Sequence, residues 1–375
     1  MIEDGRCGVG IGDHRSADDT RRAREGSHHL GTGQLRTGRT TATITNHTDT
    51  AQEVMVVDHD HRYAYAEVEM VAPRVTRTLV MILPAGTFSL GCEGDDGTVS
   101  YSDPFLVSGP RPQGVHRWIP ADYSDLANVV ARYRRSVTAG LSTLATDTDR
   151  LATAASGRDR RVARERWLTA HLDYERLGAA YDTFGDYADK IDGRSDGLPG
   201  GVHDADFSGF HRLEYLLWHD GSRSATIAAA KALDRNVRGL VAAFPHQITA
   251  PNDVALRTHE VLENTMQFEL TGDTDEGSHS NLATVAANID GTEMTLKALK
   301  PLLQQNDPAK LSQAEASLAA LDKTVSGLRK DGTWPALDSL DRRRREQLNA
   351  AVAQTLETLA PIPTELEILP THDNG

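Results

Sequence analysis

The amino-acid sequence predicts a two-domain protein, with a β-sandwich in its N-terminal part and an all-α antiparallel bundle in its C-terminal part. Residues 39–108 contain short β-branched or alternating runs with a turn signal roughly every 10 residues, which is typical of a sandwich. From Ser124 onward, apolar residues recur at helical spacing instead. The change falls at a proline-rich stretch, and 375 residues are enough for two or three domains.

The chain divides into five predicted segments. They are an irregular N-terminal segment (1–38), the sandwich (39–108), a linker (109–120), the helical domain (121–360) and a tail (361–375). Five runs inside the sandwich have the composition of strands and are separated by Asn, Asp, Pro or Gly. These runs are Thr41–Thr45, Glu53–Val57, Tyr63–Glu69, Val75–Ile82 and Thr87–Leu90.

The helical domain is predicted from a 3–4 spacing of apolar residues. The clearest case is Trp167, Ala170, Tyr174, Leu177, Tyr181 and Phe184. Short loops between such amphipathic segments imply antiparallel packing. The predicted helices cover 158–187, 206–218, 225–244, 252–270, 282–303, 308–328 and 337–359.

Composition and charge narrow the classes of function. With 40 basic and 54 acidic residues the net charge is −14, which argues against nucleic-acid binding and suits a cation-binding protein. No apolar run approaches the length of a membrane span. Two cysteines, Cys7 and Cys92, are too few for a disulfide scaffold, but they can pair in an oxidising compartment. The first residues lack the pattern of a signal peptide, so either the protein is cytosolic or this start lies downstream of an export signal.

The segment Asp206–Trp218 contains the pair with the clearest chemical meaning, His211 and Glu214. In a helix, residues i and i+3 lie on one face, about 5–6 Å apart at Cβ. An imidazole and a carboxylate at this spacing can share one metal ion. The alternative is an ordinary helix with one solvated glutamate.

Other acids and imidazoles fall at suggestive positions. His171 and Glu175 flank the apolar seam of the clearest helix at i and i+4, although Glu175 can also reach water or Arg176. Asp192 sits at a probable helix end, where a turn aspartate is also common. Further along, His259, Glu260 and Glu263 share a helix, and the acidic segment 272–279 resembles a calcium loop only superficially.

The ligand types restrict the metal. One imidazole with several carboxylates suits Fe, Mn, Zn or Ca, and the helical part has no thiolate for a structural zinc or an iron–sulfur cluster. The zinc-protease pattern His-Glu-x-x-His is missing. A blue-copper site in the sandwich is not supported, because no histidine follows Cys92 until His116.

Several stretches together resemble the imelysin-like family, and within it the EfeO branch of iron-uptake proteins. In the helical part they are Trp167–Gly178, Ile191–Gly193, Leu198–Gly201 and Asp206–Glu214. In the N-terminal part, Tyr65–Glu69, Ala72–Arg74 and Pro84–Cys92 are similar to that branch's cupredoxin-like domain. The resemblance covers roughly residues 40–360 and implies a cupredoxin-like sandwich followed by a double four-helix bundle.

The resemblance also implies a site and a role. The family's metal ligands fall on His211, Glu214, Glu175 and Asp192, with Glu263, or else Glu260, as an acid from a later helix and His171 as a neighbouring or gating residue. The implied protein is exported or membrane-anchored. It would capture iron (Fe²⁺ or Fe³⁺, with zinc, calcium or copper as other candidates) and deliver it to a membrane iron permease, with a haem peroxidase as a further partner.

Two other functions stay open at this point. The first is a zinc metallopeptidase, since the imelysin family was once grouped with peptidases and a His-x-x-Glu site with zinc can activate water. The second is a ferritin-like di-metal oxidase, which uses Glu-x-x-His twice, whereas this sequence has the reversed motif once. Neither a separate general base nor an oxyanion donor is evident for the peptidase.

Overall fold

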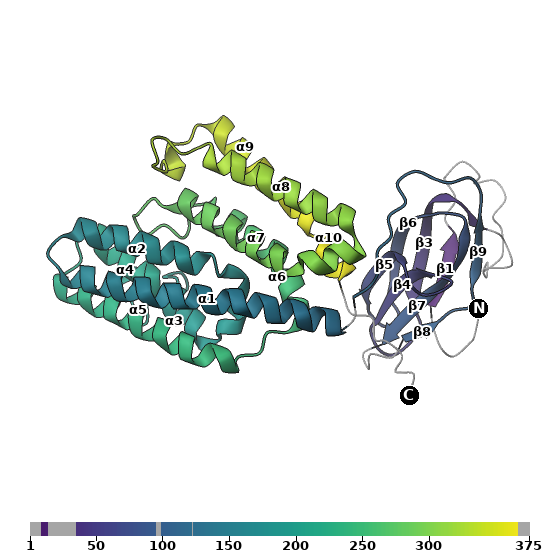
Figure 1. Ribbon diagram of the computed structural model, residues 1–375, viewed down its shortest axis with the longest axis horizontal. Coiled ribbons are helices and arrows are strands. Elements are labelled where there is room, and N and C mark those ends of the chain that lie inside the picture. Colours follow the sequence, from purple (N-terminus) through teal and green to yellow (C-terminus); the bar gives the residue numbers. More distant parts are fainter. Residues whose placement is uncertain (1–8, 14–34, 95–98, 122, 367–375) are drawn as a thin grey trace. The chain divides into compact units, whose positions relative to one another are not determined.

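The computed structural model describes residues 9–13, 35–94, 99–121 and 123–366 and divides into two compact units. One unit comprises the chain up to Tyr123 together with Gln305–Asp307 and the chain from Thr364 onward. The other comprises Ser124–Gln304 and Pro308–Pro363. The first is built on β-strands and the second is helical (Figure 1). The predicted change from strands to helices is therefore confirmed.

The β-strands form two sheets around one core. The core mixes side chains of both sheets, such as Ile44 with Val56 and Leu79 with Leu90. The three-stranded sheet has the order β1 (Val9–Asp13), β3 (Gly38–Asn46), β6 (Thr76–Leu83), all antiparallel. The other sheet has the order β2 (Leu35–Arg36), β9 (Phe105–Ser108), β7 (Gly86–Gly94), β4 (Gln52–Asp58), β5 (Ala64–Val71), with β8 (Val99–Tyr101) also paired to β7.

The five strands expected from the sequence are present as β3 to β7, with ends that differ from the expected ones by one to four residues. Strands β1 and β2 lie in the segment expected to be irregular, and β8 and β9 were not predicted. These four strands have only two to five residues, too few to show an alternating period, and they form by pairing with longer strands. The cupredoxin-like type of the domain remains a prediction.

Cys92 lies buried in β7 and is disulfide-bonded. Cys7, the other cysteine of the sequence, lies outside the described residues.

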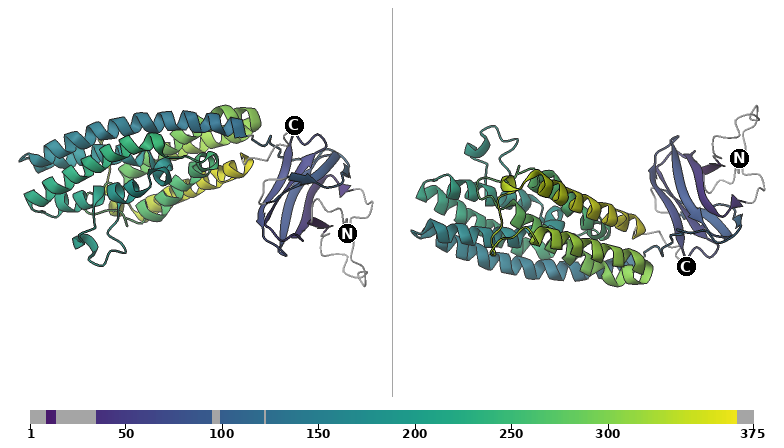
Figure 2. Two further views of the ribbon diagram at one scale, coloured as in Figure 1. Left: turned by 90° about the horizontal axis from the view of Figure 1, so that it is seen from below. Right: turned by 90° about the horizontal axis from the view of Figure 1, so that it is seen from above.

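The helical unit contains long helices that run side by side (Figure 1, Figure 2). Helix α4 packs on α2, α3 and α5, and α8 packs on α9. No helix in the described part of the chain has the length and apolarity needed to cross a membrane. The helices are α1 (Tyr123–Ser156), α2 (Arg160–Glu175), α3 (Asp186–Asp192), α4 (Gly209–Trp218), α5 (Arg223–Ala243), α6 (Pro251–Asn264), α7 (Asn281–Asn306), α8 (Pro308–Ser326), α9 (Arg342–Leu359) and α10 (Pro361–Glu365). The division into two four-helix bundles remains a prediction.

Three predicted helices are interrupted. The one expected over 337–359 is a 3₁₀ turn, Leu337–Ser339, followed by α9 from Arg342. The other two interruptions shape the region described below. The helix expected over 158–187 ends at Glu175, continues as the 3₁₀ segment Gly178–Phe184 and resumes as α3 after Gly185. The apolar spacing misled the prediction because residues on both sides of the break face one core, where Tyr174 and Tyr181 stack at 4.6 Å. The helix expected over 252–270 gives way after Asn264 to a π turn, Thr265–Glu269.

Asn46 provides a test of the sandwich. Its side chain is fully buried, and its Nδ2 donates to the carbonyls of Thr50 and Val71, both at 2.7 Å. Asn46→Ala leaves both acceptors without their donor, so we expect a loss of roughly 1–3 kcal/mol in the free energy of unfolding measured with urea. Asp49→Ala, at an exposed neighbour, is the control and should change it by less than about 0.5 kcal/mol. Equal losses in the free energy of unfolding for the two substitutions would contradict a stabilising role of the buried Asn46 hydrogen bonds.

Candidate metal centre

Helix α2 supplies the first imidazole and carboxylate. Asp159 caps the helix by accepting from the amides of Arg161 and Val162, and this fixes the helix start. His171 and Glu175 lie on the buried face, with 3.2 Å between His171 Nε2 and Glu175 Oε1. The ring of Trp167 stacks on His171 at 4.7 Å and so holds the imidazole in an apolar setting.

Helix α4 supplies the second pair. His211 and Glu214 are both buried on one face, as the spacing predicted. His211 Nδ1 lies 3.7 Å from Glu214 Oε2. Trp167 Nε1 donates to the carbonyl of Phe210 at 3.0 Å, which ties α4 to α2 directly beside His211.

Asp192 reaches this cluster because of Gly209. Gly209 begins α4 with a φ of +80°, and a Cβ there would lie 2.2 Å from the carbonyl oxygen of Ile191. Only glycine fits both the conformation and the close approach. The end of α3 therefore abuts the start of α4, and Asp192 Oδ1 lies 3.4 Å from His211 Nε2.

Side chains from α2, α3 and α4 thus converge. His171, Asp192 and His211 each present one ligand atom, and these atoms lie within 4.8 Å of one another. Glu175 adjoins His171, and Glu214 adjoins His211. His171, expected as a neighbour of the site, lies inside this group. The two nitrogens of the His211 ring face different carboxylates, Nε2 toward Asp192 and Nδ1 toward Glu214.

The structure does not bring Glu263 or Glu260 to the cluster. The Glu263 side chain is 56% exposed, and its Oε1 lies 3.7 Å from Nε2 of His259 on the same helix. Glu260 pairs with Arg257. Both glutamates precede the π turn, so the turn does not change the direction of their side chains. They point where a regular α-helix of about 3.6 residues per turn places them.

Glu269 is the acid from a later element that does face the cluster, and the sequence analysis missed it. It ends the π turn, whose extra residue per turn changes the direction of the side chains that follow. Its carboxylate is buried and accepts from Thr274 Oγ1 at 2.7 Å and from Asn281 Nδ2 at 3.2 Å. The available signal was an acid within an apolar run, between Phe268 and Leu270.

The acidic segment 272–279 also belongs to this region. The amides of Glu276 and Ser278 donate to Glu214 Oε1 at 3.2 and 2.9 Å. A cavity of about 380 Å³ opens on the other side of the segment, lined among others by Asp275, His279 and Asn281. Asn281, which lines this cavity, donates from Nδ2 to Glu269 Oε2 at 3.2 Å, so one residue separates the cavity from a buried carboxylate of the cluster.

The buried charges perturb one another. Burial raises the pKa of Glu175 and of Glu269 to about 7 each, and that of Asp192 to about 6. Burial alone would lower the pKa of His211, but Asp192, Glu214 and Glu175 outweigh it and raise this pKa to about 10. The pKa of His171 is lowered, mainly by burial. Without a metal, this cluster therefore holds protons that the same groups would release in water.

Several buried polar atoms in the cluster lack a protein partner. Among the described residues, both ring nitrogens of His171, Nδ1 of His211 and Oδ1 of Asp192 have no hydrogen bond that meets normal geometry. Buried polar atoms are ordinarily paired, and imidazole nitrogens with carboxylate oxygens are ligands of divalent and trivalent metals. Ligands about 2.05 Å from one tetrahedral ion stand about 3.3 Å apart, close to the 3.2 and 3.4 Å separations seen here. These residues fit a metal ion.

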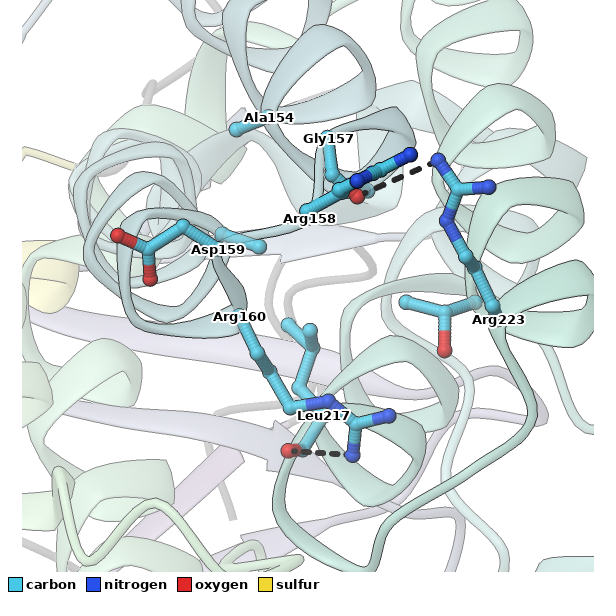
Figure 3. A pocket seen from close by; sticks show the side chains of 10 residues that line it. Ala154, Gly157, Arg158, Asp159, Arg160, Leu217 and Arg223 are labelled. Carbon is cyan, nitrogen blue, oxygen red and sulfur yellow. Dashed lines mark hydrogen bonds between the residues drawn. The ribbon is translucent and has the colours of Figure 1, made fainter.

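A second cavity has the opposite character. It measures about 200 Å³ and is lined among others by Arg158, Arg160 and Arg223 (Figure 3). Arg223 donates to the carbonyl of Ser156 at 2.6 Å, and Arg160 donates to that of Gly221 at 2.8 Å. Guanidinium groups around this space repel a cation, so the carboxylate cluster is the better candidate for a metal.

The fold and the cluster together define a helical protein with a buried His-x-x-Glu site. The chain belongs to the imelysin family, whose sequence model matches residues 129–362. The similarity to the EfeO branch is also confirmed. The chain is 25% identical over 338 residues to the iron uptake system component EfeO of Escherichia coli (strain K12), covering 87% of this chain and 85% of that protein. It is 24% identical over 301 residues to the protein of the same name from Yersinia pseudotuberculosis, covering 79% and 77%.

Glu269→Gln tests the electrostatics of the cluster in metal-free protein. The folded state binds the Glu269 proton more tightly than the unfolded state, because the pKa rises from 4.5 to about 7. This contribution to stability is present below pH 4.5 and is lost as the pH rises through 7. Glutamine does not titrate, so the variant does not lose stability in this way. The free energy of unfolding of the variant minus that of the parent should therefore increase from pH 5 to pH 8 by on the order of 2–3 kcal/mol.

The measurement is urea unfolding at both pH values with a chelator present. Glu263→Gln makes the same change of side chain at an exposed glutamate away from the cluster and is the matched control. If the free energies of unfolding of Glu269→Gln and the parent differ by the same amount at pH 5 and pH 8, the raised pKa of Glu269 is contradicted.

Proposed function

We propose that this chain is the extracytoplasmic iron-binding component of an iron-uptake system, which captures iron at the cluster and delivers it to a membrane permease. The observation that carries the proposal is the convergence of buried imidazoles and carboxylates from α2, α3, α4 and the π turn. The names of the EfeO relatives, which describe an iron uptake system component, favour iron over zinc, calcium or copper.

The geometry supports distinct roles for the residues. His211 Nε2, Asp192 and His171 would hold the ion, with Glu175 and Glu269 beside them. Glu214 faces the other nitrogen of His211 and is itself fixed by two backbone amides, so it would orient the ring. A metal-bound histidine commonly directs its second ring nitrogen at a carboxylate, and His211 Nδ1 lies 3.7 Å from Glu214 Oε2. The lowered pKa of His171 favours a neutral ring with a free electron pair.

The charge balance suits reversible capture. The carboxylates of the cluster, when ionised, carry a negative charge that a divalent or trivalent ion offsets in part. In the absence of metal, protons and the charged His211 ring reduce that charge instead, as the raised pKa values indicate. Metal and protons therefore compete for the same groups, and a fall in pH weakens binding.

An exported location and partner proteins are part of the proposal. The disulfide of Cys92 supports an oxidising compartment. The relatives' names describe one component of a system, which supports the existence of further members. A membrane permease would take up the released ion, and a haem peroxidase is the second partner we propose.

Peptide hydrolysis has less support. It needs a general base apart from the metal ligands. Among the described residues, each carboxylate that faces the cluster is already placed against an imidazole or held by hydrogen-bond donors.

Substitutions in the cluster should lower iron affinity in a graded way. We expect Asp192→Asn and His211→Ala to weaken Fe²⁺ binding by about 100-fold or more, or about 2.7 kcal/mol, because each removes a direct ligand. Glu214→Gln should weaken Fe²⁺ binding by roughly 10-fold, which is the lower end of the loss in metal affinity seen when a residue that orients a ligand is replaced. Anaerobic calorimetry with purified full-length protein measures all three.

Glu263→Gln is the matched control and should bind as the parent does, since its side chain lies away from the cluster. Unchanged affinity in both Asp192→Asn and His211→Ala would refute the proposed function. A loss for Glu214→Gln as large as that for His211→Ala would instead make Glu214 a direct ligand, as the sequence motif predicts.

Binding should release protons. At pH 6.5 the pKa values of Glu175, Glu269 and His211 leave these groups largely protonated, so one or more protons should leave for each Fe²⁺ bound. Affinity should then rise as the pH increases from 5.5 to 7.5. Calorimetry in two buffers of different ionisation enthalpy counts the protons, and a count of zero at pH 6.5 would contradict this expectation.

A further inference from the structure

A second group of metal-ligating side chains lies outside the cluster described above. It consists of His116, Asp307 and Glu365, whose ligand atoms lie within 4.8 Å of one another. All three belong to the compact unit that contains the sheets. They come from three separate stretches of the chain, the segment after β9, the residue before α8 and the end of α10.

The distances have the pattern expected of ligands that share one ion. His116 Nε2 lies 3.1 Å from Glu365 Oε1 and 3.6 Å from Asp307 Oδ2, so one nitrogen faces both carboxylates. Around a tetrahedral ion with ligands at about 2.05 Å, neighbouring ligand atoms stand about 3.3 Å apart. The two observed distances lie on either side of this value.

Burial distinguishes this group from ordinary surface charges. The side chains of Asp307 and Glu365 are only 7% and 5% exposed, whereas that of His116 is 47% exposed. Two buried carboxylates facing one point favour a cation there, since their charges repel. The exposed imidazole leaves that point open to solvent and to incoming ions.

The backbone and a neighbouring ring hold His116 in place. Trp118 stacks on the imidazole at 5.6 Å and is itself buried. The backbone of Trp118 exchanges two hydrogen bonds with Ala64 at the start of β5, at 2.9 and 3.1 Å. The segment that carries His116 is therefore fixed to the six-stranded sheet, and this limits the entropy that ligand binding would cost.

We propose that His116, Asp307 and Glu365 form a second metal site, which takes a divalent first-row ion. One imidazole and two carboxylates make a borderline donor set that suits Zn²⁺, Mn²⁺ or Fe²⁺, and water would complete the coordination. The site differs from the buried cluster in having three ligands and an exposed imidazole, so it should bind more weakly and exchange faster. It does not depend on the proposed role of the buried cluster.

Zinc titration of full-length protein tests the proposal. The background is the double variant Asp192→Asn with His211→Ala, which removes direct ligands of the buried cluster. We expect this background to retain about one equivalent of Zn²⁺, measured by competition with a chromophoric chelator. Adding His116→Ala should weaken the retained binding at least tenfold, and Asp307→Asn or Glu365→Gln should do the same while preserving side-chain shape.

His59→Ala is the matched control, because His59 is an exposed histidine of the same unit. On the same background it should leave zinc binding unchanged. Mn²⁺ gives an independent readout. Its paramagnetism should broaden the Trp118 indole resonance in the background protein and should not do so after His116→Ala.

Three results would overturn the proposal. They are no zinc binding by the background protein, equal binding with and without His116→Ala, and a His116→Ala variant that loses thermal stability but not zinc, which would make the group an ion pair only. The proposed iron site fails separately, if the parent and the background bind Fe²⁺ with the same stoichiometry and affinity.

Discussion

The structure of the helical unit depends on one electrostatic constraint, the burial of His211 between carboxylates. Asp192 faces one nitrogen of the ring and Glu214 faces the other, while Glu175 and Glu269 are buried nearby. Burying a single unpaired charge is costly, and grouping like charges adds repulsion. The raised pKa values of Glu175, Asp192 and Glu269 express this cost, which the metal-free cluster lowers by keeping protons. The carboxylates in turn stabilise the proton on His211 and raise its pKa. A bound cation would lower this cost further, which is the electrostatic basis of the proposed metal site.

The irregular backbone of the helical unit is concentrated at this constraint. Gly209 allows α3 to meet α4, and Gly291 allows α7 to pass the end of α2, where a Cβ would lie 2.8 Å from the carbonyl oxygen of Arg176. One consequence is that Asn288 lies on α7 beside Glu175. With its amide nitrogen turned toward Glu175, Asn288 donates to Oε2 at 3.1 Å. The π turn before Leu270 brings in Glu269. The junction at Gly209 and the π turn depart from regular helix, and each brings an acid, Asp192 or Glu269, to the cluster.

The sequence predicted site residues best where their relative positions follow from the regular repeat of an α-helix. The spacing of His171 with Glu175 and of His211 with Glu214 placed each pair on one face, since helical geometry alone determines that relation. Asp192 was a candidate because it precedes a glycine at a helix end. The helical period predicted the wrong acid from residues 252–270, since it favoured Glu263 and the structure brings Glu269 to the cluster. A regular helix over 252–270 gives no reason to prefer Glu269, and only the π turn, which depends on tertiary packing, separates the two. The short strands β1 and β2 were not predicted for a related reason, because they form only by pairing with other strands.

The same chemistry occurs twice in this chain with different access to water, and the difference bears on function. In the buried cluster every carboxylate is mostly enclosed and the local charge is high, which favours tight binding coupled to proton release. At His116 the imidazole is half exposed, so an ion bound at the second proposed site would keep solvent ligands and could leave without proton rearrangement in a buried core. A protein that must both capture an ion and give it up needs a means of release. Under the proposed function, competing protons would supply it in the buried cluster, because His211 and the neighbouring Glu175 and Glu269 have pKa values near or above neutral pH.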